Sequence, residues 1–315
     1  MLKYIIAIDS GATKSEVILV PFAGSVNPEL SGWKQMQFPA INFNLLGFDE
    51  TAKRLISIIK IASVKPGLKN IAFISAGISG ARFEKDRSLL EKKISKALKF
   101  GNIKIYPDTE IAFASVFDDK EKNCGIMIAG TGSVLYYRDN KNKIKKIGGW
   151  GRHFGDEGSG YWIAKEALRH VTMHYDVIGR YTSVLKHIRN EFGINRDNIV
   201  EHVYHKNFDI SKVTPFVFKS AKKGDTIAKD IIYNAAARLA HHFTALGKAN
   251  ARIALCGSLF SQEKLLEKYL KQISKEKFPN IKFVKPVVSP VWGAVKLAVL
   301  SLRTPESRNL GAGRK

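Results

Sequence analysis

The sequence has few cysteines and no long apolar run, and these absences exclude several classes of protein. Its 315 residues include two cysteines, Cys124 and Cys256, each inside a short apolar run typical of a buried strand. Neither has a second cysteine at the spacing of a zinc or redox motif, which disfavours a metal cluster and fits a reducing compartment. The first apolar stretch, Tyr4 to Ile8, ends at Asp9 and is shorter than a signal-peptide core of at least ~7 residues. We therefore expect a cytoplasmic protein with no membrane partner.

Acidic side chains are also scarce, because 28 Asp and Glu stand against 51 Lys and Arg, for a formal net charge of +23. Such a balance raises the question of a nucleic-acid or membrane partner. However, the excess is spread out: residues 1–150 hold 23 basic and 14 acidic side chains, and residues 151–315 hold 28 and 14. Lysine predominates over arginine, the usual reader of phosphates and base edges, and no helical pattern has a continuous basic face. We expect a lysine-rich solvated surface and no nucleic-acid partner.

Short runs rich in Ile and Val alternate with helical patterns, which is typical of an α/β protein. The predicted strands cover residues 4–8, 16–20, 33–38, 70–76, 103–106, 125–129, 134–138, 143–148, 252–256 and 281–284. The predicted helices cover 48–62, 83–99, 111–117, a set between about 156 and 249, 261–274 and 290–302. At about 150 residues per domain the length predicts two domains. We place an N-terminal lobe at 1–120, a C-terminal lobe at 121–303 and a tail at 304–315.

A weak internal repeat, in which a strand, a turn with glycine and a hydroxyl residue, and a second strand follow each other, occurs at 5–20 and again at 126–138. Two copies predict two hairpin turns on either side of a central cleft. In the first turn, Gly11 lets the backbone approach a ligand closely, while Thr13 and Lys14 offer donors to phosphate oxygens. A strand rather than a helix follows, so this is not a Walker A loop. An ordinary hairpin turn is the alternative.

The second turn places Thr131 between Gly130 and Gly132 at the end of a strand. Backbone amides there can point at an anion while the hydroxyl donates a further hydrogen bond. Two turns of this kind in one chain predict phosphate binding more strongly than either turn alone.

Two further segments carry polar residues where ligands bind. Asp108 follows the predicted strand 103–106, at the carboxyl end where α/β sheets hold ligands, although the position also suits a helix N-cap. The run 148–162 combines many glycines with two tryptophans and with Asp156 and Glu157. This composition predicts a loop close to a small polar ligand, with a flexible linker as the alternative.

One helical segment superficially resembles a metal site, because Glu166, His170 and His174 fall on one face. The position where a helical zinc site would carry its general base is hydrophobic, and no ligand from another element is evident. A polar helix face is the better account.

Several of these segments resemble the phosphate, connecting and adenosine motifs of the actin, hexokinase and heat-shock ATPase superfamily. They are residues 9–14, 108, 130–133, 149–158 and 255–258. Within it, the chain from about residue 4 to 302 is similar to N-acetylglucosamine kinases of the benzoyl-CoA reductase activator type ATPase group. The combination of GWG at 149–151 with GDEGS at 155–159 is the specific part. The resemblance implies an α/β fold with two ribonuclease H-like lobes, as in actin-like ATPases, and ATP-dependent phosphorylation of N-acetylglucosamine to its 6-phosphate.

The resemblance also implies a role for each matched residue. Asp9 would hold Mg²⁺ through water, and Asp108 would accept the proton of the sugar 6-hydroxyl. The residues implied to bind ATP are Gly11, Thr13, Lys14, Thr131, Gly132, Thr214, Gly257 and Ser258. Those implied to bind the sugar are Asn42, Ser79, Gly80, Ser133, Trp150, Gly151 and Asp156. The expected partner is a small-molecule sugar, and a homodimer is one assembly open to the chain.

Two departures from the family pattern bear on the substrate. Asn44 stands where mammalian-like enzymes have a tryptophan, which leaves glucosamine, N-acetylmuramic acid and glucose open as other sugars. The zinc-binding cysteines of repressor-related sugar kinases and the cluster cysteines of reductase activators find no match. Two alternatives of a different kind are a regulatory ATPase without transfer to a small molecule and a basic nucleic-acid binder.

Overall fold

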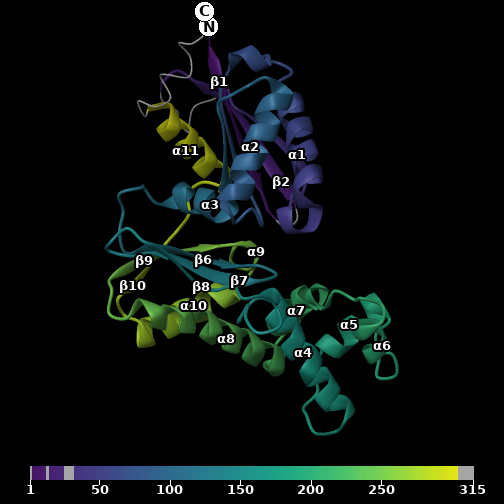
Figure 1. Ribbon diagram of the computed structural model, residues 1–315. Helices are drawn as coiled ribbons and strands as arrows, with labels where there is room; N and C mark the ends of the chain where they lie inside the picture. The colour runs from purple at the N-terminus through teal and green to yellow at the C-terminus, as the bar shows by residue number, and fades with distance from the viewer. Residues whose placement is uncertain (1, 12–13, 25–31, 304–315) are drawn as a thin grey trace, which may run out of the picture. The chain divides into compact units, whose positions relative to one another are not determined.

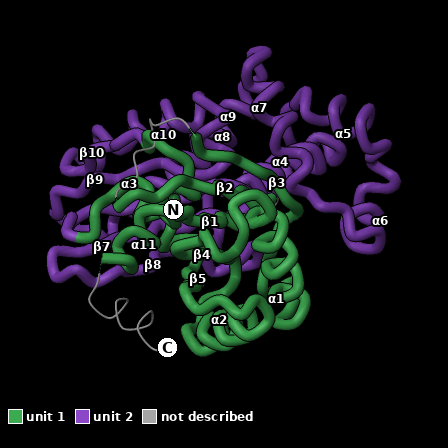
Figure 2. The backbone as a smooth tube through the Cα atoms, turned by 90° about the horizontal axis from the view of Figure 1, so that it is seen from above, with its two compact units in different colours: residues 1–119, 286–315 green, residues 120–285 purple. Residues whose placement is uncertain are grey.

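The computed structural model describes residues 2–11, 14–24 and 32–303. The chain divides into two compact units, shown in different colours in Figure 2. Unit 1 comprises Met1–Asp119 and Pro286–Lys315, and unit 2 comprises Lys120–Lys285.

Unit 1 is built on a mixed five-stranded sheet in the order β3-β2-β1-β4-β5 (Figure 1). Its strands are β1 (Lys3–Ser10), β2 (Lys14–Phe22), β3 (Lys34–Pro39), β4 (Ile71–Ile78) and β5 (Ile103–Pro107). The first three form an antiparallel meander, and β4 and β5 run parallel to β1. The carboxyl ends of β1, β4 and β5 therefore meet at one edge of the sheet, where ligands bind in open α/β sheets.

Helices cover both faces of this sheet, and Figure 1 shows α1 and α2 on one side and α11 on the other. The helices are α1 (Phe43–Ala62), α2 (Glu84–Leu98), α3 (Asp108–Val116) and α11 (Val291–Arg303), with a 3-10 turn η1 (Leu68–Asn70). Alternation along β1 explains the two layers, because Ile6 and Ile8 join the core with α1 and α2 while Ile5 and Ala7 join the core with α11.

Helix α11 lies in unit 1, whereas its place in the sequence predicts that it belongs to the C-terminal lobe 121–303. It packs on β1, β4 and α3, and Gly293 lies so close to the Ile111 carbonyl that a Cβ there would be 1.8 Å from the oxygen. Periodicity identifies a helix but does not say which sheet it covers, which is the physical reason for the difference.

Unit 2 repeats the strand order of unit 1, as β10-β9-β6-β7-β8. Its strands are β6 (Cys124–Ala129), β7 (Ser133–Arg138), β8 (Ile144–Gly148), β9 (Ala251–Cys256) and β10 (Ile281–Val284). Again the first three are antiparallel, and the last two run parallel to the first. The internal repeat seen in the sequence is thus present in the topology.

Unit 2 also holds a large helical set that unit 1 lacks. It consists of α4 (Gly160–Tyr175), α5 (Val184–Phe192), α6 (Ile199–Tyr204), α7 (Thr214–Lys222), α8 (Thr226–His241), α9 (Ser258–Gln262) and α10 (Lys264–Lys277), with 3-10 turns η2 (Ile210–Val213) and η3 (His242–Leu246). One core joins the sheet to these helices. The stripe Ile227, Ile231, Ala235 and Leu239 of α8 is buried in it, as its spacing predicts.

Most predicted elements are present within a few residues, and two differ. The predicted helix 261–274 is two helices, because the chain leaves helical geometry at Glu263 (φ −122°, ψ 89°). Helix α1 begins at Phe43 rather than residue 48, with a break at Gly47 (φ 70°) that interrupts the apolar period. In the part of the chain that the structure describes, no helix is long and apolar enough to cross a membrane.

Candidate active site

The first hairpin turn joins β1 to β2 and follows Asp9. The two strands pair up to Ser10 and Ser15, and the Gly11 amide donates to the Lys14 carbonyl at 3.1 Å. Lys14 is exposed, so its ammonium group is free to meet an anion. Thr13 lies outside the described residues.

The Asp9 carboxyl is in an environment that disfavours its charge. Its pKa is raised to about 7, mainly by burial and then by the negative charges of Asp108 and Glu16, while the positive charge of Lys14 opposes the rise. No group of three or more His, Cys, Asp or Glu that could hold a metal occurs among the described residues. A site with one or two carboxylates is the kind that Mg²⁺ uses together with waters and substrate phosphates.

Asp108 is the first residue of α3, at the carboxyl end of β5. One carboxylate oxygen accepts from the Thr109 amide at 2.8 Å. Burial raises the pKa of this carboxyl, while hydrogen bonds from the Ser79 side chain and Thr109 and the positive charge of Arg82 oppose the rise. The N-cap position itself belongs to Pro107, so Asp108 is not the helix cap that the sequence offered as an alternative.

Three of the predicted sugar residues lie together in unit 1. Asn42 forms a parallel β-bridge with Ser79, whose side chain also bonds Asp108. The Asn42 side-chain oxygen accepts from the Asn44 amide at 3.0 Å and lies against Gly80, where a Cβ would be 3.0 Å from it. Gly80 has φ +83°, so this close approach depends on glycine. Asn42, Ser79, Gly80 and Asp108 thus form one polar cluster.

The second hairpin turn, residues 130–132, is held by backbone contacts. The Gly130 amide donates to the Gly132 carbonyl at 2.9 Å, the Gly160 amide to the Gly130 carbonyl at 2.8 Å, and the Tyr161 amide to the Thr131 carbonyl at 3.2 Å. The turn is therefore fixed on the first residues of α4.

Three of the predicted site residues lie directly against this turn: Asp156, Gly257 and Ser258. A Cβ on Gly132 would be 3.0 Å from an Asp156 carboxylate oxygen, and one on Gly130 would be 3.3 Å from the Ser258 hydroxyl. Gly257, at φ +99°, approaches Ala129 so closely that a Cβ would be 2.3 Å from its carbonyl oxygen. Asp156 itself has φ 53°, an uncommon conformation for a residue with a side chain.

Two predicted ligand residues use their hydroxyls inside the protein. The buried Ser133 hydroxyl donates to the Glu157 carbonyl at 2.7 Å, and the buried Thr214 hydroxyl donates to the Gly160 carbonyl at 2.6 Å. Both hydroxyls therefore hold the loop and helix beside the turn, and their direct contact with a ligand stays a prediction.

The loop 148–158 presents a tryptophan to solvent. Trp150 is 71% exposed, and the Lys146 ammonium lies 5.5 Å from its ring centroid. The Gly155 amide donates to the Gly151 carbonyl at 2.8 Å, which closes the loop next to the Trp150 backbone. Compact backbone contacts of this kind do not fit a flexible linker.

The rival metal constellation on α4 is a polar helix face. Glu166 pairs with Arg169, one turn further along, at 2.9 Å. Sequence reasoning missed four other residues beside the candidate site: Arg82, whose charge acts on Asp108, and Ser10, Ser15 and Arg54, whose contacts are described below. The contacts of Ser10 with Ile41, of Ser15 with Pro39 and of Arg54 with Ala40 span 31, 24 and 14 residues, so no local motif marks them.

Comparison with known proteins gives a family and two curated relatives. The model of the BadF/BadG/BcrA/BcrD ATPase family matches residues 6–298. An N-acetylmuramic acid/N-acetylglucosamine kinase of Clostridium acetobutylicum is 27% identical over 309 residues, covering 94% of this chain and 98% of the relative. An N-acetyl-D-glucosamine kinase of Dictyostelium discoideum is 26% identical over 318 residues, with the same coverage.

Solved structures give the fold. A Chromobacterium violaceum protein assigned to the N-acetylglucosamine kinases superposes with a TM-score of 0.74 at 20% identity, covering 94% of this chain and 99% of that one. A ROK family glucokinase from Streptomyces griseus, in complex with glucose and AMPPNP, superposes with a TM-score of 0.56 at 12% identity, covering 93% and 99%. The chain has the α/β fold of the actin-like sugar kinases.

Proposed function

Since the chain belongs to the BadF/BadG/BcrA/BcrD ATPase family, we propose that it transfers the γ-phosphoryl group of ATP to the 6-hydroxyl of N-acetylglucosamine. The names of both curated relatives support an amino-sugar substrate. The observation that carries the proposal is the partly buried Asp108 carboxyl in a cluster with Ser79 and Asn42. Its partners are then two small molecules, and the two free thiols fit a cytoplasmic location.

In this proposal Asp108 is the general base. Its raised pKa keeps the carboxylate basic enough to accept a proton from the sugar hydroxyl, and the Thr109 amide holds one of its oxygens. The residues proposed to bind the sugar are Asn42, Ser79, Gly80, Trp150, Gly151 and Asp156. A base in this role contributes about 10² to 10⁴ in rate.

The two hairpin turns bind the nucleotide phosphates. Lys14 would supply an ammonium group, Gly11 would let the backbone of its turn come close to the phosphates, and Thr131 and Gly132 would supply a hydroxyl and amides. Gly257 and Ser258 bind the adenosine. Phosphoryl transfer asks mainly for positioning and charge stabilisation, which donors of this kind provide.

Mg²⁺ fits the residues around Asp9. This carboxyl is partly buried and has two acidic neighbours, so a cation there would relieve the repulsion that raises its pKa. Asp9 would hold the ion through water, and the ion would neutralise phosphate charge. Lys14 orients the same phosphates.

A second substrate, a sugar that carries a carboxylate such as N-acetylmuramic acid, is favoured by one observation. Arg82 is exposed, acts electrostatically on Asp108 and forms no ion pair within the described ranges. A guanidinium group there would attract an anionic substituent.

The test is ADP release with Mg-ATP against amino sugars, N-acetylmuramic acid and neutral hexoses. Parent protein is compared with Asp108→Asn and with the matched control Glu110→Gln, which removes an exposed charge from the same turn of α3. We expect turnover that depends on sugar, falls by about 10² to 10⁴ in Asp108→Asn and persists in the control.

Equal hydrolysis in all three proteins, with no phosphorylated sugar, would contradict the kinase and favour a regulatory ATPase. A preference for N-acetylmuramic acid that disappears in Arg82→Gln would favour the carboxylate sugar.

A further inference from the structure

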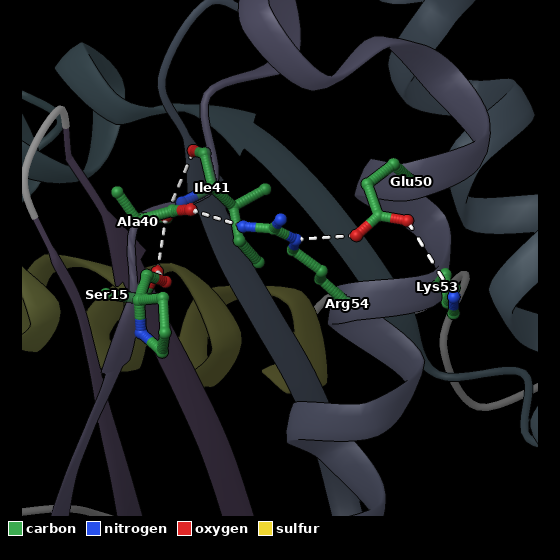
Figure 3. Close-up of polar contacts among 8 residues, drawn as sticks. Ser15, Ala40, Ile41, Glu50, Lys53 and Arg54 are labelled. Atoms are coloured by element: carbon green, nitrogen blue, oxygen red, sulfur yellow. Dashed lines mark hydrogen bonds and ion pairs between the residues drawn. The ribbon is translucent and has the colours of Figure 1, made fainter.

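Three consecutive carbonyls, from the last residue of β3 towards α1, each lie within hydrogen-bond distance of a side chain far away in the sequence. The Ser15 hydroxyl lies 2.9 Å from the Pro39 carbonyl oxygen, and the Ser10 hydroxyl lies 3.0 Å from the Ile41 carbonyl oxygen. Between them, Arg54 donates to the Ala40 carbonyl at 3.3 Å (Figure 3). Glu50 accepts from Arg54 at 2.8 Å and so holds the guanidinium in place. Side chains thus meet each carbonyl from 39 to 41, whereas about two-thirds of the hydrogen bonds in a folded protein join backbone to backbone.

The two serines bond each other as well. Their hydroxyl oxygens are 2.6 Å apart, and the Ile41 amide donates to the Ser10 oxygen at 2.8 Å. Each hydroxyl has one proton, so two protons serve the serine pair and the carbonyls of Pro39 and Ile41. In either arrangement one serine donates to the other and one donates to the segment. Both side chains are fully buried, so water does not compete.

These serines flank the first hairpin turn, and the segment that they hold leads directly into Asn42. Ser10 and Ser15 are the last cross-strand pair before the turn with Gly11 and Lys14. The Ser10 carbonyl also accepts from the Ser79 amide at 3.0 Å, and the Ser79 carbonyl accepts from the Phe43 amide at 2.9 Å. Ser10 is therefore the common anchor of the phosphate turn, the strand end with Ser79 and the segment before Asn42.

We propose that Ser10 and Ser15 are positioning residues that fix Asn42, and through it the sugar, relative to the phosphate turn. The inference rests on the proposed function, since it assigns these serines to the sugar side of that reaction. Without the Ser10 hydroxyl, the Ile41 amide is buried without its acceptor, and the segment moves to pair it. The turn keeps its strand pairing, so nucleotide binding changes little.

The test is the KM for the sugar and the KM for Mg-ATP in Ser10→Ala, Ser15→Ala and the double variant. We expect Ser10→Ala to raise the sugar KM about tenfold while the Mg-ATP KM stays within about twofold. Ser15→Ala should raise the sugar KM about threefold, because Ile41 keeps its partner in Ser10. The double variant should raise the sugar KM by less than the product of the two single increases, since both hydroxyls belong to one network.

Ser75→Ala is the matched control. Ser75 lies in β4 beside β1, is fully buried, and its hydroxyl has no hydrogen-bond partner among the residues described. Its removal should leave both KM values unchanged.

A sugar KM within about twofold of the parent in Ser10→Ala, or an equal rise in both KM values, would overturn the proposal. If Ser10→Ala does not fold, an unchanged sugar KM in Ser15→Ala overturns it instead. If the parent shows no turnover with any sugar, the proposed function fails. If the parent turns over sugar and the serine variants keep its sugar KM, only the positioning role is refuted.

Discussion

The two units use one strand order but fix their hairpin turns differently. In unit 1 the turn is flanked by Ser10 and Ser15, and both hydroxyls reach the segment after β3. In unit 2 the corresponding pair is Ala129 and Ser133, so a single hydroxyl reaches the segment after β8, at Glu157. Unit 2 relies instead on glycines at close backbone contacts, such as Gly257 against Ala129. With the same strand order, the turn of unit 1 is thus flanked by side-chain hydrogen bonds, whereas the turn of unit 2 is packed through glycines that let backbones approach closely.

The largest effect is expected from a substitution that disrupts this glycine packing in unit 2. Gly257→Ala places a Cβ 2.3 Å from the Ala129 carbonyl oxygen at φ +99°, so the backbone must shift. We expect the free energy of unfolding to fall by about 3 kcal/mol, measured by urea unfolding, with faster hydrogen exchange in 124–138.

Gly101→Ala in unit 1 is the control, because a Cβ there meets nothing within 4 Å. Equal stability of the Gly257 and Gly101 variants would show that unit 2 does not depend on this contact.

An effect of intermediate size is expected from the protonation of Asp9 in unit 1. Because the Asp9 pKa is about 7, protonation below that pH removes the carboxylate that would hold Mg²⁺. Affinity for Mg-ATP should therefore rise about tenfold from pH 6 to pH 8, measured by isothermal titration calorimetry. Asp9→Asn should weaken binding and remove the pH dependence.

Glu16→Gln sharpens this prediction. Glu16 is one of the charges that raise the Asp9 pKa, so its removal should move the midpoint to lower pH. Because the Asp9 pKa is higher in the folded than in the unfolded chain, Asp9 makes the fold less stable as pH rises from about 4 to 7. Asp9→Asn should therefore be more stable than the parent at pH 8 and equally stable at pH 3. A pH-independent affinity in the parent would contradict the assignment of Asp9.

The smallest effect concerns the helical set that only unit 2 has. Asp225 caps α8 and accepts from the Ala228 and Ser183 amides and the Thr182 and Ser183 hydroxyls. Burial alone would raise its pKa, but these hydrogen bonds outweigh burial and lower it. Asp225→Asn should cost about 1 kcal/mol at pH 7, measured by chemical unfolding.

The contribution of Asp225 is present above its unfolded pKa near 3.8 and is lost as pH falls through the lower folded value. The free energies of unfolding of the parent and Asp225→Asn should therefore converge at acid pH. The sugar KM of Asp225→Asn should equal that of the parent at pH 7. An altered KM would mean that the helical set takes part in sugar binding.

Local sequence patterns predicted the strands, most helices and the residues at strand ends. Asp108 drew attention by its position at the carboxyl end of a predicted strand, and the family resemblance implied the role of Asp9; both roles stay predictions. The internal repeat predicted two turns, and both are present. These features depend on spacing within a few residues, which the sequence displays directly.

The contacts that fix the site could not be predicted in this way. Ser10 meets Ile41 across 31 residues and Thr214 meets Gly160 across 54, so their partners depend on the tertiary fold. Thr214 shows the consequence, because its residue type suits a ligand contact while its hydroxyl is used inside the protein. The break at Glu263 was also missed, since apolar residues continue through it.

The position of α11 has a consequence for the order in which the protein is made. The face of β1 that carries Ile5 and Ala7 is covered by residues 291–303, which leave the ribosome more than 280 residues later. Unit 2 is continuous in sequence and can complete its core before α11 exists, whereas the earlier-made strands of unit 1 must wait with an open apolar face. During synthesis the half that emerges first is thus finished last, and it is this half that chaperones would need to shield.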